Sequence, residues 1–120
     1  MAIIRNIEID GMHMPFKASA AIPRIYRLKF GRDIFTDMNK LIDAVQGGDP
    51  ETSTLDNFSL EMFEDIAYTM AKYADPAQPD TVEEWLDQFN AFSIYIILPE
   101  LVELWNLNSA TMIESKKNGA

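Results

Sequence analysis

The sequence predicts a mainly helical α+β domain in which an N-terminal β-hairpin packs on about five helices. Two observations lead to this fold class. The first residues alternate between apolar and polar up to Asp10-Gly11, which is the pattern of a strand entering a tight turn. Beyond the hairpin, apolar residues recur at helical spacing, and glycines and prolines separate one segment from the next.

The composition is that of one globular domain over residues 1–120. Hydrophobic residues make up 48% of the chain and charged residues 24%, which is enough to bury one core. The net charge of −9 argues against binding to nucleic acid or anionic membranes, because both need clustered Lys and Arg. The chain has no cysteine, which excludes disulfides and thiolate metal sites. We expect no signal peptide and no membrane-spanning segment.

The hairpin is predicted over residues 1–16. Ile7 and Ile9 alternate with polar residues, Asp10-Gly11 forms the turn, and the return strand runs from Met12 to Phe16. Pro15 lacks an N–H group, so this strand is expected to be an edge or to end early. An isolated hairpin is marginally stable, so it either lies on the chain's own helices, which we favour, or offers an open edge to another chain.

Residues 22–107 are predicted to form the helical core. The first helix has Pro23 in its first turn and ends at Gly31. Its apolar stripe is expected to comprise Ile25, Leu28 and Phe30. The second helix, capped by Asp33 or Thr36, ends before Gly47-Gly48-Asp49-Pro50. Its predicted apolar positions are Ile34, Phe35, Met38, Leu41, Ile42 and Val45.

Three further helices are predicted. Ser59 is expected to cap the third, whose apolar face comprises Phe63, Ile66, Ala67, Met70 and Ala74. Thr81 and Glu84 read as a capping box that starts the fourth. Ser93 caps the last, and Pro99 should kink it or start a new helix. We expect the stretch Thr81–Leu107, which holds both tryptophans, to be the centre of the core. Residues 108–120 are predicted to form a tail, whose order the pattern leaves open.

No arrangement typical of catalysis, cofactor binding or metal binding is visible, so we do not expect an enzyme. His13 is the only histidine, and we expect it at the surface. Carboxylates recur at helical spacing without the histidine motif of two-metal bundles, so solvated helix faces explain them. They are Glu61, Glu64, Asp65, Glu83, Glu84, Asp87, Glu100 and Glu103.

One basic cluster stands out in this acidic chain. It comprises Lys17, Arg24, Arg27, Lys29 and Arg32. It is either a site for an anion or acidic partner, or a solvated face paired with the surplus carboxylates. We favour the second alternative.

Four segments occur in an order that resembles one protein family. They are IEIDG with PFKASAAIPRIYRLKFGRDIF, then LEMFEDIAYTMAKYADP, then EEWLDQF, then IYIILPELVELWNLN with ESKKN. Together they reach from about Ile7 to Asn118. The chain thereby resembles the tail assembly chaperones of long-tailed bacteriophages and prophages of Gram-positive bacteria. The resemblance rests on the ordered set, because no single motif is specific.

The resemblance implies a small, largely helical, non-enzymatic assembly factor without cofactors. Such chaperones act in the cytoplasm of the bacterial host and are absent from the mature virion. They bind the tape-measure protein and keep it soluble while tail-tube subunits polymerise around it. Some self-associate, and many have a longer form made by programmed ribosomal frameshifting. Residues 114–118 can be encoded by a long adenine run suited to frameshifting. Lysine codons that are all AAG would contradict this hypothesis.

A chaperone of this kind needs an exposed apolar surface. The sequence offers one candidate surface near the end of the chain, formed by Leu104, Trp105, Leu107, Met112 and Ile113. As the alternative, Leu104 and Trp105 complete the core. The competing function is an acidic helical regulator that binds a basic protein partner. A small enzyme would need turnover that depends on His13.

Overall fold

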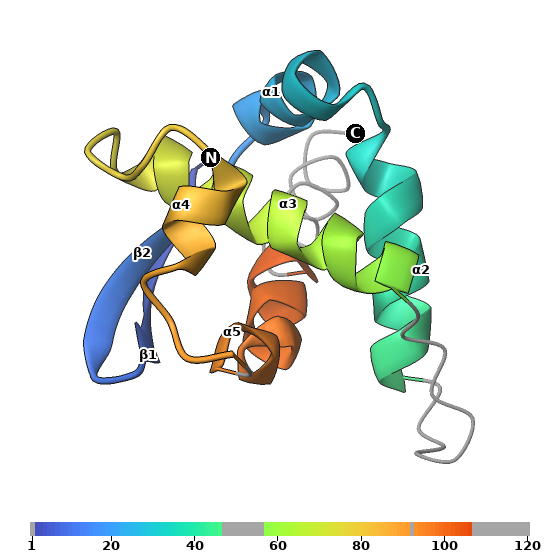
Figure 1. Ribbon diagram of the computed structural model, residues 1–120. Helices are drawn as coiled ribbons and strands as arrows, with labels where there is room; N and C mark the ends of the chain where they lie inside the picture. Colours follow the sequence, from blue (N-terminus) through green and yellow to red (C-terminus); the bar gives the residue numbers. More distant parts are fainter. Residues whose placement is uncertain (1, 47–56, 92, 107–120) are drawn as a thin grey trace.

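A β-hairpin and six helical segments make up the part of the chain that the computed structural model describes, residues 2–46, 57–91 and 93–106 (Figure 1). This is the mainly helical α+β fold that the sequence predicts. The elements are β1 (Ile3–Ile9), β2 (Met12–Ala18), α1 (Ala21–Phe30), α2 (Ile34–Gln46), α3 (Asn57–Ala74), α4 (Val82–Leu86), α5 (Ser93–Ile96) and a last helix over residues 98–106.

The hairpin lies on the chain's own helices, which confirms the favoured alternative. Strands β1 and β2 are antiparallel, and Asp10 and Gly11 turn between them with positive φ angles of 53° and 80°. The inner face of β2 packs on α3. The return strand continues past the predicted end to Ala18, with Pro15 opposite Asn6. In an antiparallel hairpin, residue pairs that exchange backbone hydrogen bonds alternate with pairs that do not. Counted outward from the turn, Asn6 and Pro15 form a pair that does not, so the missing N–H of Pro15 costs no hydrogen bond between the strands.

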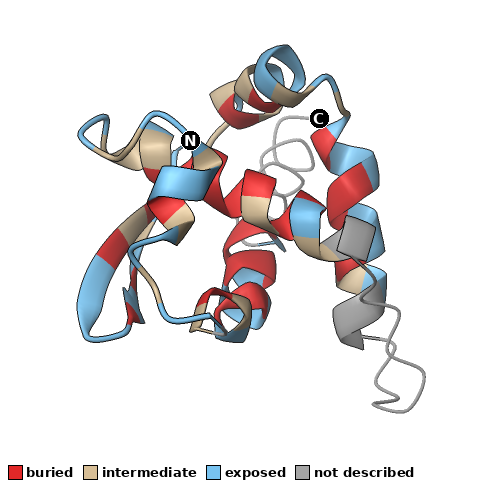
Figure 2. Cartoon of the chain, viewed as in Figure 1, coloured by how far each residue is buried: buried red, intermediate tan, exposed pale blue. Residues whose placement is uncertain are grey.

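Helix α3 lies at the centre of the fold, and it shares the core with the stretch that was predicted to be the core's centre, which contributes buried residues from Trp85 to Trp105. α3 contacts β2, α1, α2 and α4, and it crosses the middle of the molecule in Figure 1. It is buried along most of its length (Figure 2). Its buried apolar residues are Met62, Phe63, Ile66, Ala67, Tyr68, Met70 and Ala71. The helix begins at Asn57, so Ser59 lies inside it and is not the residue before its start.

The stretch after residue 81 is part of the core but breaks into short helices. Trp85 on α4 is completely buried and its ring packs edge-on against Phe16, Tyr68 and Phe89. Pro99 lies in the first turn of the helix over residues 98–106, so a new helix starts there, as one alternative predicts. Ile96 is 75% exposed, because α5 is a single turn that covers the core with one side.

The predicted ends of α1 and starts of α2 and α4 are confirmed. Gly31 ends α1 in the left-handed conformation, with φ 71°. The Asp33 carboxylate accepts the Phe35 N–H (3.0 Å) and the Thr36 hydroxyl (3.0 Å) at the start of α2. The Thr81 hydroxyl accepts the Glu84 N–H (3.2 Å) at the start of α4. These caps satisfy N–H groups that have no partner within the helix.

The predicted apolar stripe of α1 is confirmed at Phe30, which packs against the core, and is wrong at Leu28. Ile22 and Tyr26, four residues apart, face the core, whereas Leu28 is 72% exposed. Because α1 already begins at Ala21, the core-facing positions include Ile22, and Leu28 falls on the opposite side. The helix therefore presents an apolar residue to solvent, among the arginines and lysines of its outer face.

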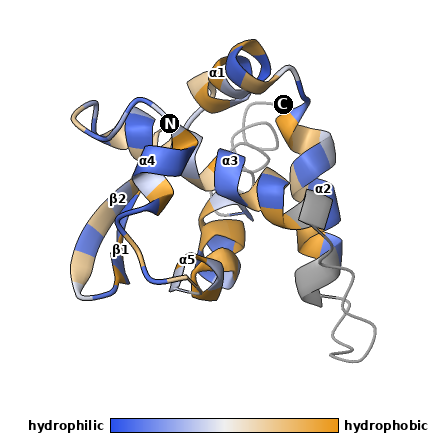
Figure 3. Cartoon of the chain, viewed as in Figure 1, coloured by the Kyte–Doolittle hydropathy of each residue, from blue (hydrophilic) through white to orange (hydrophobic). Residues whose placement is uncertain are grey.

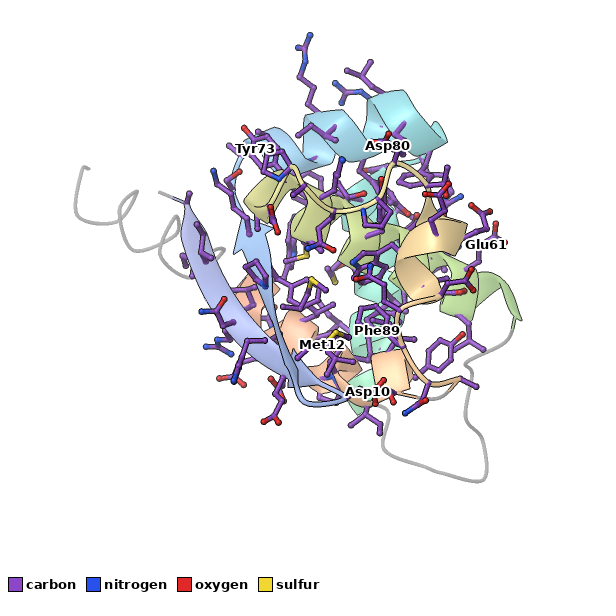
Figure 4. All side chains as sticks on the ribbon, turned by 60° about the vertical axis from the view of Figure 1, so that its left-hand side comes forward. Asp10, Met12, Glu61, Tyr73, Asp80 and Phe89 are labelled. Atoms are coloured by element: carbon purple, nitrogen blue, oxygen red, sulfur yellow. The ribbon has the colours of Figure 1, made fainter. Side chains whose placement is uncertain are left out.

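Asp10 ties the tip of the hairpin to the loop between α4 and α5. Its carboxylate accepts the backbone N–H of Asn90 (2.8 Å) and the hydroxyl of Ser93. Figure 4 shows Asp10 at this end of the hairpin. The hydrogen bonds from Ser93 and Asn90 hold the pKa of Asp10 below its ordinary value of 3.8.

The Asp10→Asn variant tests this tie, since asparagine tolerates the same positive φ. A lowered folded-state pKa means that the contribution of Asp10 to stability is present above pH 3.8 and is lost as pH falls through the folded pKa. We expect the variant to melt at a lower temperature than the parent at pH 7. The difference should shrink below pH 3.8 in thermal unfolding followed by circular dichroism. A difference that does not change with pH would contradict this account.

Candidate partner-binding surface

Phe35 is a large aromatic residue that the fold leaves 54% exposed. The core-facing stripe of α2 is formed by Ile34, Met38 and Leu41, at positions i, i+4 and i+7. Phe35 is one position off this stripe, so its side chain lies at the edge of the core and is half exposed. Its predicted place on the buried face is therefore wrong. Figure 3 shows hydrophobic and hydrophilic positions on different sides of α2 and α3.

The exposed ring of Phe35 contacts Trp105. The ring centroids are 5.7 Å apart and the rings are tilted by 58°. Trp105 belongs to the helix over residues 98–106, whose buried residues are Leu98, Leu101, Val102, Leu104 and Trp105. Only 7% of Trp105 is exposed. The core thus reaches the surface at Phe35 and Trp105, which we call the aromatic pair.

The structure decides between the alternatives for the two described residues of the predicted surface. Leu104 is completely buried and Trp105 almost so, because the inner side of their helix faces the core. They therefore complete the core and do not form an exposed surface by themselves. Leu107, Met112 and Ile113 lie outside the described residues. The sequence pattern did not identify Phe35, whose half-exposed ring continues the apolar area of Trp105 at the surface.

One member of the predicted basic cluster is structural. Arg32 pairs with Asp65 (Nη2 to Oδ2, 2.6 Å) and with Asp37 (Nε to Oδ2, 3.0 Å), and its Nη2 donates to the Tyr26 hydroxyl (2.9 Å). The Tyr26 hydroxyl donates to Asp37 (2.6 Å). This four-residue network joins α1, α2 and α3. Asp65 is buried, so its predicted place on a solvated face is wrong, and burial raises its pKa even beside Arg32.

An open cleft of about 750 Å³ lies beside this network. Its wall includes the carboxylates of Glu61, Glu64 and Glu83. Burial raises the pKa of Glu64, and the neighbouring charges of Asp65 and Glu61 raise it further. Within the described ranges, no three His, Cys, Asp or Glu side chains are placed to hold a metal ion. The cleft is therefore polar and acidic, with no metal-binding arrangement in those ranges.

The other four residues of the basic cluster have no carboxylate partner in the part of the chain that the structure describes. Arg24 and Arg27 are exposed and make no ion pair among the described residues. Lys29 donates to the backbone oxygen of Asp80 (3.4 Å), and Lys17 lies over the ring of Tyr73 (4.6 Å). Among the described residues, the favoured pairing with carboxylates is therefore seen for Arg32 and for no other member of the cluster. His13 is exposed, as predicted.

Comparison with known proteins found no match to a protein-family model, a curated protein or a solved structure. In the described part of the chain, no helix combines the length and apolar character needed to cross a membrane.

Proposed function

We propose that the chain is a non-enzymatic phage tail assembly chaperone that binds the tape-measure protein in the cytoplasm of the bacterial host. It keeps that protein soluble while tail-tube subunits polymerise around it. The observation that carries this proposal is the ordered set of four segments, from about Ile7 to Asn118, that resembles this family.

Physical features of the chain support the proposal. A holdase needs an apolar surface on a body that resists aggregation. The aromatic pair supplies exposed apolar area, because Phe35 is 54% exposed beside Trp105. The net charge of −9 favours solubility of a complex with an apolar partner. An apolar face of a tape-measure helix would pack on the exposed ring of Phe35.

Replacing Phe35 by aspartate tests the proposed surface. We expect the Phe35→Asp variant to bind the tape-measure protein about tenfold or more weakly, because exposed aromatic anchors dominate such interfaces. Ile96→Asp is the matched control, since Ile96 is 75% exposed but lies on α5. Affinity is measured by titration of purified proteins, and circular dichroism checks that both variants fold. Equal affinity of the two variants would exclude the aromatic pair as the binding surface.

The alternative function, an acidic regulator of a basic partner, has one observation in its favour. Glu61, Glu64 and Glu83 line the open cleft beside Arg32. Binding through this cleft would fall steeply with added salt and would survive Phe35→Asp, because it depends on charge. Binding at the aromatic pair would show the opposite behaviour in both respects.

A further inference from the structure

One edge of strand β1 has no strand beside it in the described part of the chain. The sheet consists of β1 and β2 alone among those residues, so β1 pairs with β2 on one side only. Figure 1 shows the hairpin at the margin of the molecule. A strand with an open edge presents a row of N–H and C=O groups with which another strand can pair. This edge is therefore a place where the fold can accept a further backbone contact.

The register of the hairpin identifies the backbone groups on this edge. Ile9 and Met12 flank the two-residue turn and exchange hydrogen bonds, and such pairs alternate along the hairpin with pairs that do not. The residues of β1 in the second kind of pair are Ile4, Asn6 and Glu8. Their N–H and C=O groups point away from β2, and they make no backbone hydrogen bond with other described elements. All three residues are exposed.

The two outer edges of the hairpin differ in how well they accept a strand. On the outer edge of β2, the corresponding residues are His13, Pro15 and Lys17. Pro15, in the middle of this edge, has no N–H to donate, and proline and lysine both protect an edge from pairing. The outward residues of β1 include neither, and Ile4 leaves an apolar side chain 58% exposed there. An added strand is therefore expected at β1 and not at β2.

A second copy of β1 fits this edge in the antiparallel orientation. When Asn6 lies opposite Asn6 of the second copy, Ile4 lies opposite Glu8, so outward-facing residues meet only outward-facing residues. Each outward N–H and C=O group of β1 then gains a partner. All seven residues of the strand, Ile3–Ile9, are paired in this register.

Charge favours this register over the neighbouring ones. In it, Arg5 lies opposite Ile7 of the second copy and Glu8 lies opposite Ile4, so no like charges face each other. Moving the second copy by two residues toward the open end of the hairpin places Arg5 opposite Arg5, which is destabilising. Moving it by two residues toward the turn leaves Ile3 and Ile4 without a partner. One register thus combines full pairing with compatible charges.

We propose that the chain forms a symmetric dimer in which β1 pairs with β1 of a second copy. The two hairpins then make one continuous sheet with the strand order β2–β1–β1–β2. Backbone hydrogen bonds supply most of the contact, and Ile4 packs on the aliphatic part of Glu8 of the second copy. Pro15 interrupts both outer edges of this sheet, so the assembly closes at the dimer. The inference rests on the edge of β1 and does not depend on the proposed function.

Sedimentation equilibrium of the full chain over a range of concentrations tests the proposal. The salt concentration is about 0.15 M, at which repulsion between two chains of net charge −9 is screened. We expect a reversible equilibrium between monomer and dimer for the parent chain. Hydrogen exchange followed by NMR should show that the amides of Ile4, Asn6 and Glu8 exchange more slowly as the concentration of the chain rises.

Substitutions of exposed residues test the register. Ile4→Glu places a carboxylate opposite Glu8 of the second copy, and we expect it to weaken the dimer by about tenfold or more. Adding Glu8→Lys should restore most of the lost affinity, because opposite charges then face each other. The matched control adds Asp43→Lys to Ile4→Glu, which gives the same net charge. Asp43 is exposed on α2, across the molecule from the hairpin in Figure 1, so this control should not restore affinity.

A parent chain that stays monomeric at its highest soluble concentration would overturn the proposal, and that measurement needs no variant. An undiminished dimer in Ile4→Glu, or equal restoration by Glu8→Lys and Asp43→Lys, would also overturn it. Assemblies larger than a dimer that persist in Ile4→Glu would place the contact between copies elsewhere and have the same consequence. Circular dichroism checks that each variant folds, as expected for substitutions at exposed positions.

Discussion

Replacing Arg32 by alanine is expected to destabilise the fold by about 3 kcal/mol. The guanidinium is the only cation that pairs with Asp37 and Asp65 in the described residues, and the side chains of these two residues are 7% and 9% exposed. Without Arg32, two buried carboxylates keep their desolvation cost and lose the charge that offsets it. The free energy of unfolding, measured by urea denaturation at pH 7, should show the loss directly.

Arg24→Ala is the matched control for this prediction. It removes the same side chain from an exposed position that makes no ion pair with any described residue, so its effect should stay within about 0.5 kcal/mol. Combining Arg32→Met with Asp37→Asn and Asp65→Asn should recover part of the lost stability, because no buried charge then remains. An Arg32→Ala variant as stable as Arg24→Ala would show that the network does not hold the three helices together.

Replacing Trp85 by alanine is expected to cost about 3–5 kcal/mol. Trp85 is completely buried, and its ring lies 6.3 Å from that of Phe16, 5.9 Å from Tyr68 and 5.1 Å from Phe89. It is thus the main link from the short helix α4 to both β2 and α3. Because α4 has five residues, it depends on this contact more than on its own hydrogen bonds.

Ile96→Ala, at a 75% exposed position, provides the control and should change stability by less than about 0.5 kcal/mol. Both variants are compared with the parent by urea denaturation, with indole fluorescence and circular dichroism as independent probes. If Trp85→Ala unfolds at the same urea concentration as the control, α4 does not contribute to the core in the way described.

Local signals in the sequence predicted the positions where elements turn, begin and end. Asp10-Gly11 predicted the turn, Gly31 the end of α1, and Thr81 the cap of α4, because each needs one residue type in one backbone conformation. Pro99 indicated either a kink or a helix start, and the structure shows the helix start. These features depend on neighbours along the chain, so the sequence shows them directly.

Features that depend on distant contacts were not predictable in the same way. The stretch Thr81–Leu107 is rich in aromatic residues, yet α3 is central because its small and large residues are buried on several sides at once. The sequence held one indication of the Arg32 network, because the polar groups of Tyr26, Asp37 and Asp65 belong to residues at or next to core positions of their helices. A polar residue at such a position needs a partner, but the sequence does not show that the partner of Asp65 is Arg32.

The candidate surface was predicted only in its general location. The helical period shows that Leu104 and Trp105 share an apolar side, but the packing of that side against α2 decides whether it is exposed. Phe35 is exposed for the opposite reason, because its neighbour Ile34 takes the core position. Single-residue differences of this kind depend on where each helix begins relative to its partners.

The central claim, that the chain is a chaperone for the tape-measure protein, is tested most directly by co-expression of the two proteins. The amount of tape-measure protein in the soluble fraction is measured with and without the chain, and the soluble protein is tested for co-purification. The account predicts that the tape-measure protein becomes soluble and co-purifies with the chain. A tape-measure protein that stays insoluble and unbound, with the chain and any longer frameshifted product of its gene both present, would contradict it.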